Sequence, residues 1–169
     1  QSSAASLSLP ATGYVRWAGL YWMCRSTTAA RWDVKLRTPT SGAYLNRTAS
    51  VQFNGANNAY MGLVDVTTDV RAGGVGDYWV GNMTCDTGTD RWGGWSLVVI
   101  YEDVNEPLRD LVVWDGMQSY QNTAVTLNLT GFVTPFNAAV PVVTDLGYFV
   151  GDGDLGAADT FRLISGALN

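Results

Sequence analysis

The sequence predicts an all-β protein, an antiparallel β-sandwich of jelly-roll-like type with about ten strands. Short runs rich in β-branched and aromatic residues alternate with clusters of Gly, Asn, Asp and Pro, at the spacing typical of sandwiches and barrels. No window of about 12 residues keeps an unbroken helical period of apolar residues. Hydrophobic residues make up 47% of the chain and charged residues only 15%, so the chain can form a substantial core.

Ten segments carry the strand pattern, each bounded by turn-forming residues. In chain order they are Tyr14–Trp22, Trp32–Thr38, Ala49–Phe53, Met61–Val66, Asp77–Met83, Trp95–Tyr101, Leu108–Trp114, Ala124–Leu129, Val140–Phe149 and Thr160–Ile164. Helix is expected to be minor, with one turn near Val66–Arg71.

Two of these segments also indicate which faces they bury. Apolar and charged residues alternate from Trp32 to Arg37, so this strand is expected to have one wet face and one core face. Trp95–Tyr101 is apolar on both faces, which predicts a central strand covered on both sides. The tract Gly73–Asp77 is expected to form a turn, because glycine readily adopts positive φ angles. It is not interpreted as a phosphate-binding loop, because no helix follows that would present its N-terminus to a phosphate.

The chain is expected to form a single domain over residues 1–169, either complete or the N-terminal part of a longer domain or precursor. Its net charge of −5 argues against nucleic acid as a partner, since nucleic-acid binding relies on clustered Lys and Arg. No apolar run reaches the roughly 18 residues that a transmembrane helix needs, so no membrane span is expected.

Two features favour a secreted or cell-surface location. Gln1 and the small residues Ser2–Ala5 resemble the end left by a signal peptidase, the alternative being an arbitrary start of the sequence. Cys24 and Cys85 are the two cysteines, and in an oxidising compartment they are expected to form one disulfide. The alternative is a pair of buried free thiols.

Several stretches carry a resemblance to a known family. The main ones are Trp17–Trp22, Leu36–Pro39 and Gly94–Arg109, followed in the expected order by Val112–Gly116 and Gly151–Asp154. Together they resemble the N-terminal globular domain of large secreted actinobacterial and myxobacterial surface proteins, which often continue into immunoglobulin-like repeats. The resemblance spans most of residues 10–160 and implies an extracellular β-domain of uncharacterised role. The two cysteines are not part of the family pattern.

Catalysis is not expected, because the chain has no histidine and therefore lacks the commonest general base and the usual triads. Pairs of carboxylates remain, such as Glu102 with Asp103 or Asp152 with Asp154, which could in principle serve a glycoside-processing enzyme. Adjacent strand residues point to opposite faces, so Glu102 and Asp103 are not expected to converge on one bond.

Two sets of residues are candidates for binding. Asp152, Asp154 and Asp159 lie in a Gly-rich acidic loop, where carboxylate oxygens could bind calcium, although an ordinary acidic hairpin would look the same. Trp79, Trp92 and Tyr120 lie near turns and are the candidates for an exposed ligand-binding surface. The other strand tryptophans are expected in the core: Trp17, Trp22, Trp32, Trp95 and Trp114.

The leading functional hypothesis is therefore an extracellular surface interaction or assembly module, adhesin-like or structural. A carbohydrate-binding domain that recognises glycans is the alternative, and a glycoside-processing enzyme a distant one. The expected partner is another protein chain, or a further segment of the same precursor, that completes a sheet by strand addition. The exchanged element would be Thr160–Leu168 or Ser6–Pro10, unless the sequence simply stops short of its natural end.

Overall fold

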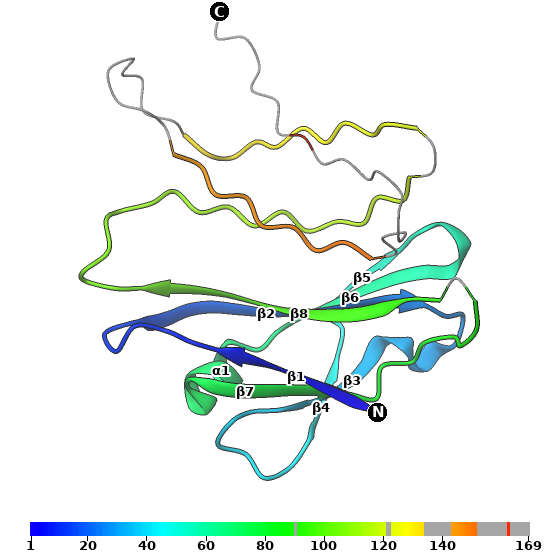
Figure 1. Ribbon diagram of the computed structural model, residues 1–169, viewed down its shortest axis with the longest axis horizontal. Helices are drawn as coiled ribbons and strands as arrows, with labels where there is room; N and C mark the ends of the chain where they lie inside the picture. Colours follow the sequence, from blue (N-terminus) through cyan, green and yellow to red (C-terminus); the bar gives the residue numbers. More distant parts are fainter. Residues whose placement is uncertain (90, 121–122, 134–142, 152–161, 163–169) are drawn as a thin grey trace, which may run out of the picture.

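The protein forms two four-stranded antiparallel sheets packed face to face (Figure 1). The computed structural model describes residues 1–89, 91–120, 123–133, 143–151 and 162. Sheet A has the strand order β1 (Ser2–Leu7), β7 (Gly76–Gly81), β3 (Asp33–Arg37) and β4 (Leu45–Thr48). Sheet B has the order β5 (Val51–Asn54), β6 (Ala59–Asp65), β2 (Tyr14–Arg25) and β8 (Gly93–Glu102). Among the described residues, helical structure is limited to α1 (Thr67–Gly73) and the 3-10 turns Ala29–Trp32 and Ala56–Asn58.

The predicted sandwich is confirmed, but the described residues contain eight strands rather than about ten. Six predicted strands and the helical turn correspond to β2, β3, β5, β6, β7, β8 and α1. The segments Leu108–Trp114 and Ala124–Leu129 form no strand, nor do residues 143–149 of the predicted Val140–Phe149. The segment Thr160–Ile164 lies outside the described residues apart from position 162.

Strands β1 and β4 were not predicted, and both lie at the ends of sheet A. The sequence of β1 is Ser-Ser-Ala-Ala-Ser-Leu, which lacks the β-branched and aromatic residues of a typical strand. It is instead specified by its neighbour, because Ser2 to Leu7 pair in unbroken register with Gly81 to Gly76 of β7. Ser6 and Leu7, from the arm expected to be exchanged between chains, are therefore paired within the chain.

The core between the sheets is centred on Trp22, which is fully buried in β2. Its indole N–H donates to the carbonyl of Arg31 at 3.0 Å, so the buried polar atom is satisfied. Gly62 of β6 lies directly opposite in the register, and a Cβ there would come within 2.6 Å of the indole ring. The absence of a side chain at position 62 thus makes room for the tryptophan.

Strand β8 lies at the end of sheet B, so its predicted central position is wrong. The central strand is β2, which pairs with both β6 and β8 and is buried continuously from Ala18 to Cys24. Both faces of β8 are nevertheless partly covered. Leu97 and Val99 pack into the core between the sheets, whereas Val98 packs against a second apolar cluster on the outer face of sheet B.

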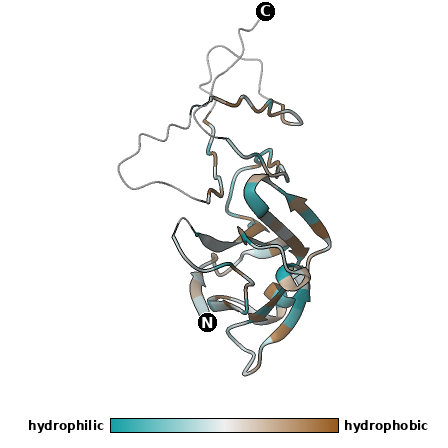
Figure 2. Ribbon diagram, turned by 90° about the vertical axis from the view of Figure 1, so that its right-hand side faces the viewer, coloured by the Kyte–Doolittle hydropathy of each residue, from teal (hydrophilic) through white to brown (hydrophobic). Residues whose placement is uncertain are grey.

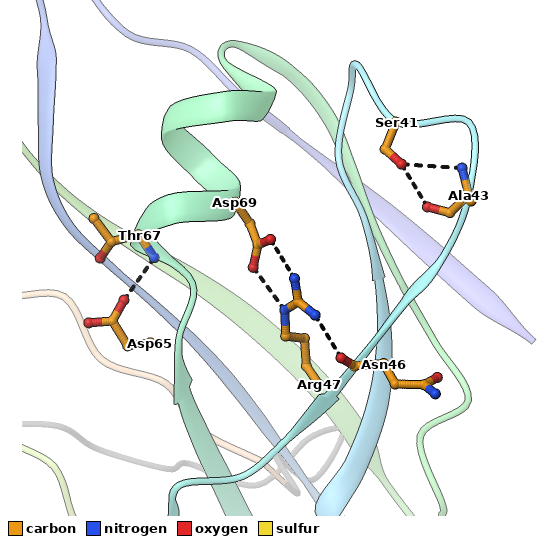
Figure 3. A network of polar contacts seen from close by, with 7 residues as sticks. All are labelled: Ser41, Ala43, Asn46, Arg47, Asp65, Thr67 and Asp69. Atoms are coloured by element: carbon orange, nitrogen blue, oxygen red, sulfur yellow. Dashed lines mark hydrogen bonds and ion pairs between the residues drawn. The ribbon is translucent and has the colours of Figure 1, made fainter.

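Helix α1 is tied to strand β4 by a polar network (Figure 3). The guanidinium of Arg47 donates from Nε to Asp69 Oδ2 at 2.8 Å and from Nη2 to Asp69 Oδ1, and it also donates to the carbonyl of Asn46 at 2.7 Å. Hydrogen bonding to the Asp69 carboxylate raises the pKa of the Arg47 guanidinium. Asp65 accepts from the backbone N–H of Thr67 at 2.8 Å, where the helix begins. The network holds the helix against the edge of sheet A.

The end of β8 is joined to the β1–β2 connection through the carboxylate of Asp103. Its oxygens accept from the backbone N–H of Asn105 at 2.8 Å and from the hydroxyl of Thr12 at 2.8 and 2.9 Å. These hydrogen bonds favour the ionised form and lower the pKa of Asp103 below 3.8.

Because the folded-state pKa of Asp103 is lowered, its contribution to stability is complete above pH 3.8 and is lost as the pH falls through the folded-state value. We expect Asp103→Asn to lower the free energy of unfolding at neutral pH, and the difference from wild type to shrink under acid. Urea unfolding from neutral pH down to about pH 3 measures this. Glu106→Gln, at an exposed neighbouring position, is the control. A difference in unfolding free energy between Asp103→Asn and wild type that does not change with pH would contradict the lowered pKa of Asp103.

Candidate functional site

The outer face of sheet B carries an apolar cluster of its own. Tyr21 and Met23 of β2 and Met61 and Leu63 of β6 are buried there. Partly buried side chains surround them: Trp17, Phe53, Trp92, Val98, Met117 and Phe149. Because side chains alternate along a strand, the apolar residues of β2 serve two separate cores, one on each face of the sheet.

This cluster is covered by the chain that follows β8, called here the outer layer and comprising the described residues 103–120, 123–133 and 143–151. Figure 1 shows these extended segments running along the side of sheet B that faces away from sheet A. Asp115 accepts a hydrogen bond from the hydroxyl of Tyr21 at 2.5 Å. Ser119 accepts from the backbone N–H of Ala56 at 3.2 Å. Burial, and then the bond to Asp115, raise the pKa of Tyr21.

The outer layer also approaches sheet B closely at Phe149 and Gly151. A Cβ at Gly151 would lie 2.4 Å from the Trp92 ring and 2.8 Å from the sulfur of Met23. Phe149 packs against the same cluster. Trp92 is thus half-buried beneath the outer layer.

Within the outer layer, two extended segments lie side by side. The Trp114 indole N–H donates to the carbonyl of Thr130 at 2.9 Å, and its ring meets that of Phe132 edge-on at 6.1 Å. The Asp110 carboxylate accepts from the backbone N–H of Val133 at 2.8 Å. These contacts are made by side chains, and no residue of the outer layer belongs to a strand.

Most of the large exposed apolar side chains in the described structure belong to the outer layer. In Figure 2, which colours the ribbon by residue hydropathy, the outer layer alternates between brown and teal stretches. The exposed apolar side chains of the outer layer are Val104, Leu108, Leu111, Val113, Trp114, Tyr120, Val125, Leu127, Phe132, Val133, Val143, Tyr148 and Val150. Such a concentration of exposed apolar surface typically marks an interaction site.

The three aromatic candidates do not form one surface. Trp79 lies on the outer face of sheet A, whereas Trp92 packs on the outer face of sheet B. Tyr120 is 56% exposed in the outer layer. Of the tryptophans predicted in the core, Trp114 is 41% exposed, because its segment lies on the outer layer instead of in a sheet.

The predicted disulfide is confirmed. Cys24, fully buried in β2, is bonded to Cys85 with a Cα–Cα distance of 5.6 Å. The backbone of β8 passes close by, since a Cβ at Gly93 would lie 2.8 Å from both sulfur atoms. The bond therefore ties the end of β2 to the segment between β7 and β8.

A shallow pocket of about 370 Å³ lies on sheet A and was not predicted. It is lined by Arg37, Thr38, Pro39, Ser41, Asp77 and Trp79. The alternation from Trp32 to Arg37 predicted that Arg37 lies on the solvent-exposed face of its strand. The alternation does not show which residues of other strands share that face. The pairing of β3 with β7 shows this, because it sets Arg37 opposite Trp79.

Of the carboxylates considered for catalysis or for calcium binding, Glu102 and Asp103 lie within the described structure. Glu102 pairs with Arg16, whereas Asp103 binds Thr12 and Asn105, so the two acids have separate partners. Asp152, Asp154 and Asp159 lie outside the described residues. Within the described part of the chain, no group of three metal-ligating side chains is found. The described part also contains no helix long and apolar enough to cross a bilayer.

Comparisons with protein-family models, curated proteins and solved structures found no match to this chain. The resemblance to secreted actinobacterial and myxobacterial surface proteins stays a prediction.

Proposed function

We propose that this protein is an extracellular surface interaction and assembly module, in which an outer-layer segment of one copy adds as a strand to the β8 edge of sheet B in a second copy. The observation that carries the proposal is the outer layer itself: an extended, apolar part of the chain that lies over sheet B and contains no strand. Extended segments with unpaired edges and exposed apolar side chains favour pairing with another chain.

A second copy is the occupant that the sequence favours. The outer layer contains Leu108–Trp114 and Ala124–Leu129, two segments with a strand-forming pattern that pair with neither sheet. Strand β8 lies at the end of sheet B. Each copy of the chain therefore carries both a donor segment and an acceptor edge, which is what homotypic strand addition requires.

The disulfide supports the extracellular location, because such bonds persist in oxidising compartments and are rare in the cytosol. A covalent tie between β2 of sheet B and the segment that follows β7 of sheet A also suits a module that must stay folded outside the cell.

Analytical ultracentrifugation of the full chain, from nanomolar to high micromolar concentration, tests the proposal. We expect reversible association for the wild type, and weaker association for the double variant Val125→Lys, Leu127→Lys, since charge replaces the exposed apolar side chains that would pack on the partner. Both positions are exposed, so the fold should be retained. The exposed Thr126→Lys adds a charge on the opposite side of the same segment and is the matched control. A wild type that stays monomeric throughout would overturn the proposal.

A further inference from the structure

The pocket on sheet A contains an arginine that is held in place by aromatic rings and has no polar partner among the described residues. Arg37 stacks on the ring of Trp79, with its central carbon 4.5 Å from the ring centroid, and on Tyr44 at 5.4 Å. Within the described parts of the chain, its guanidinium makes no hydrogen bond or ion pair, in contrast to Arg47, which binds Asp69 with two N–H groups. Two aromatic contacts thus fix the position of a cation whose donors remain available.

The other groups around Arg37 are also polar. Asp77 lies on the same sheet face, where one of its carboxylate oxygens accepts from the hydroxyl of Ser6. Ser41 fixes the adjoining loop by hydrogen bonding to both the N–H and the carbonyl of Ala43 (Figure 3). Lys35, two residues before Arg37, is exposed on the same face of β3. The pocket therefore combines a fixed cation, a partly used carboxylate and an aromatic ring.

Each of these groups favours a particular chemical feature in a ligand. The planar donor fork of arginine matches an oxyanion such as a carboxylate or sulfate. A carboxylate beside it accepts hydroxyl hydrogens.

We infer that this pocket binds an anionic saccharide unit, with the acidic group on Arg37 and a sugar hydroxyl on Asp77, while the ring of Trp79 holds the guanidinium in place. With a net charge of −5, the protein as a whole repels polyanions. Binding would therefore depend on these particular side chains, and not on a general positive surface.

Isothermal titration of the full chain with polygalacturonate, dextran sulfate and neutral dextran tests the inference. We expect binding to at least one of the two anionic polymers and none to dextran. Polygalacturonate alone would identify a carboxylate ligand and dextran sulfate alone a sulfate ligand. Failure of both anionic polymers to bind, or equal binding of dextran, would overturn the inference.

Two variants locate the site. Arg37→Gln is expected to weaken binding by about ten- to a hundredfold, since hydrogen bonds to charged groups are among the strongest. Asp77→Asn keeps the cation but loses the hydroxyl acceptor, and it should also weaken binding. Arg109→Gln removes the same charge from an exposed position in the outer layer and should leave binding unchanged. Equal losses for Arg37→Gln and Arg109→Gln, or no loss in Arg37→Gln and Asp77→Asn, would refute the assignment. Thermal melting of each variant verifies that it is folded.

Discussion

Replacing Cys24 and Cys85 together with alanine is expected to lower the free energy of unfolding by about 4 kcal/mol. The disulfide joins residues 61 positions apart, so it removes a large amount of conformational freedom from the unfolded chain. For a domain of this length, the loss corresponds to a fall in melting temperature of about 10 °C.

Urea unfolding of the oxidised wild type and of the double alanine variant measures this effect. Wild type treated with a reducing agent is a mutation-free comparison and should lose a similar amount, whereas the reducing agent should not change the double variant. If reduction and substitution both leave the midpoint unchanged, the bond does not constrain the unfolded state as described.

Replacing Trp22 with alanine is expected to cost about 3–5 kcal/mol. The side chain is fully buried between the sheets, its N–H is bonded to Arg31, and Gly62 leaves the space that the indole fills. Alanine would leave a large cavity and a carbonyl without its donor. Against a typical total of about 5–15 kcal/mol, this loss brings the domain close to unfolding.

Trp114→Ala is the matched control, because Trp114 is 41% exposed and contacts chiefly Phe132 and Thr130. Its cost should be well below that of Trp22→Ala, since surface substitutions usually change stability little. Denaturant unfolding followed by circular dichroism compares the two. Equal losses would show that the outer layer contributes as much to the domain as the core between the sheets.

Residue patterns predicted the strands that have a buried face, because burial on one side imposes alternation. In β3, the charged residues Asp33, Lys35 and Arg37 lie on the outer face, as the alternation from Trp32 onward indicated. The same reasoning failed for β8. Apolar residues on both faces report that both faces are covered, and they do not report whether the strand has one neighbour or two.

Features that depend on a neighbour could not be found from the pattern. Strand β1 is made of serine and alanine and forms because β7 pairs with it. The outer-layer segments have strand-like sequences but no partner backbone in the sheets. For the candidate sites, the cysteine pair was found because only two cysteines exist. The grouping of Arg37 with Tyr44 and Asp77 required the register of β3 and β7 and the path of a loop.

The pairing of β2 with both β6 and β8 has a consequence for how the newly made chain folds. An all-β topology with distant pairings folds slowly, because the loops between partners must close before contacts form. Because the chain is synthesised from its N-terminus, β2 can pair with β6 before β8 has been made, and the other edge of β2 is unpaired during this time. During that interval the hydrogen-bonding groups along β2 are open to any strand of another nascent chain. Early pairing between nascent chains at this edge of β2 therefore competes with completion of sheet B.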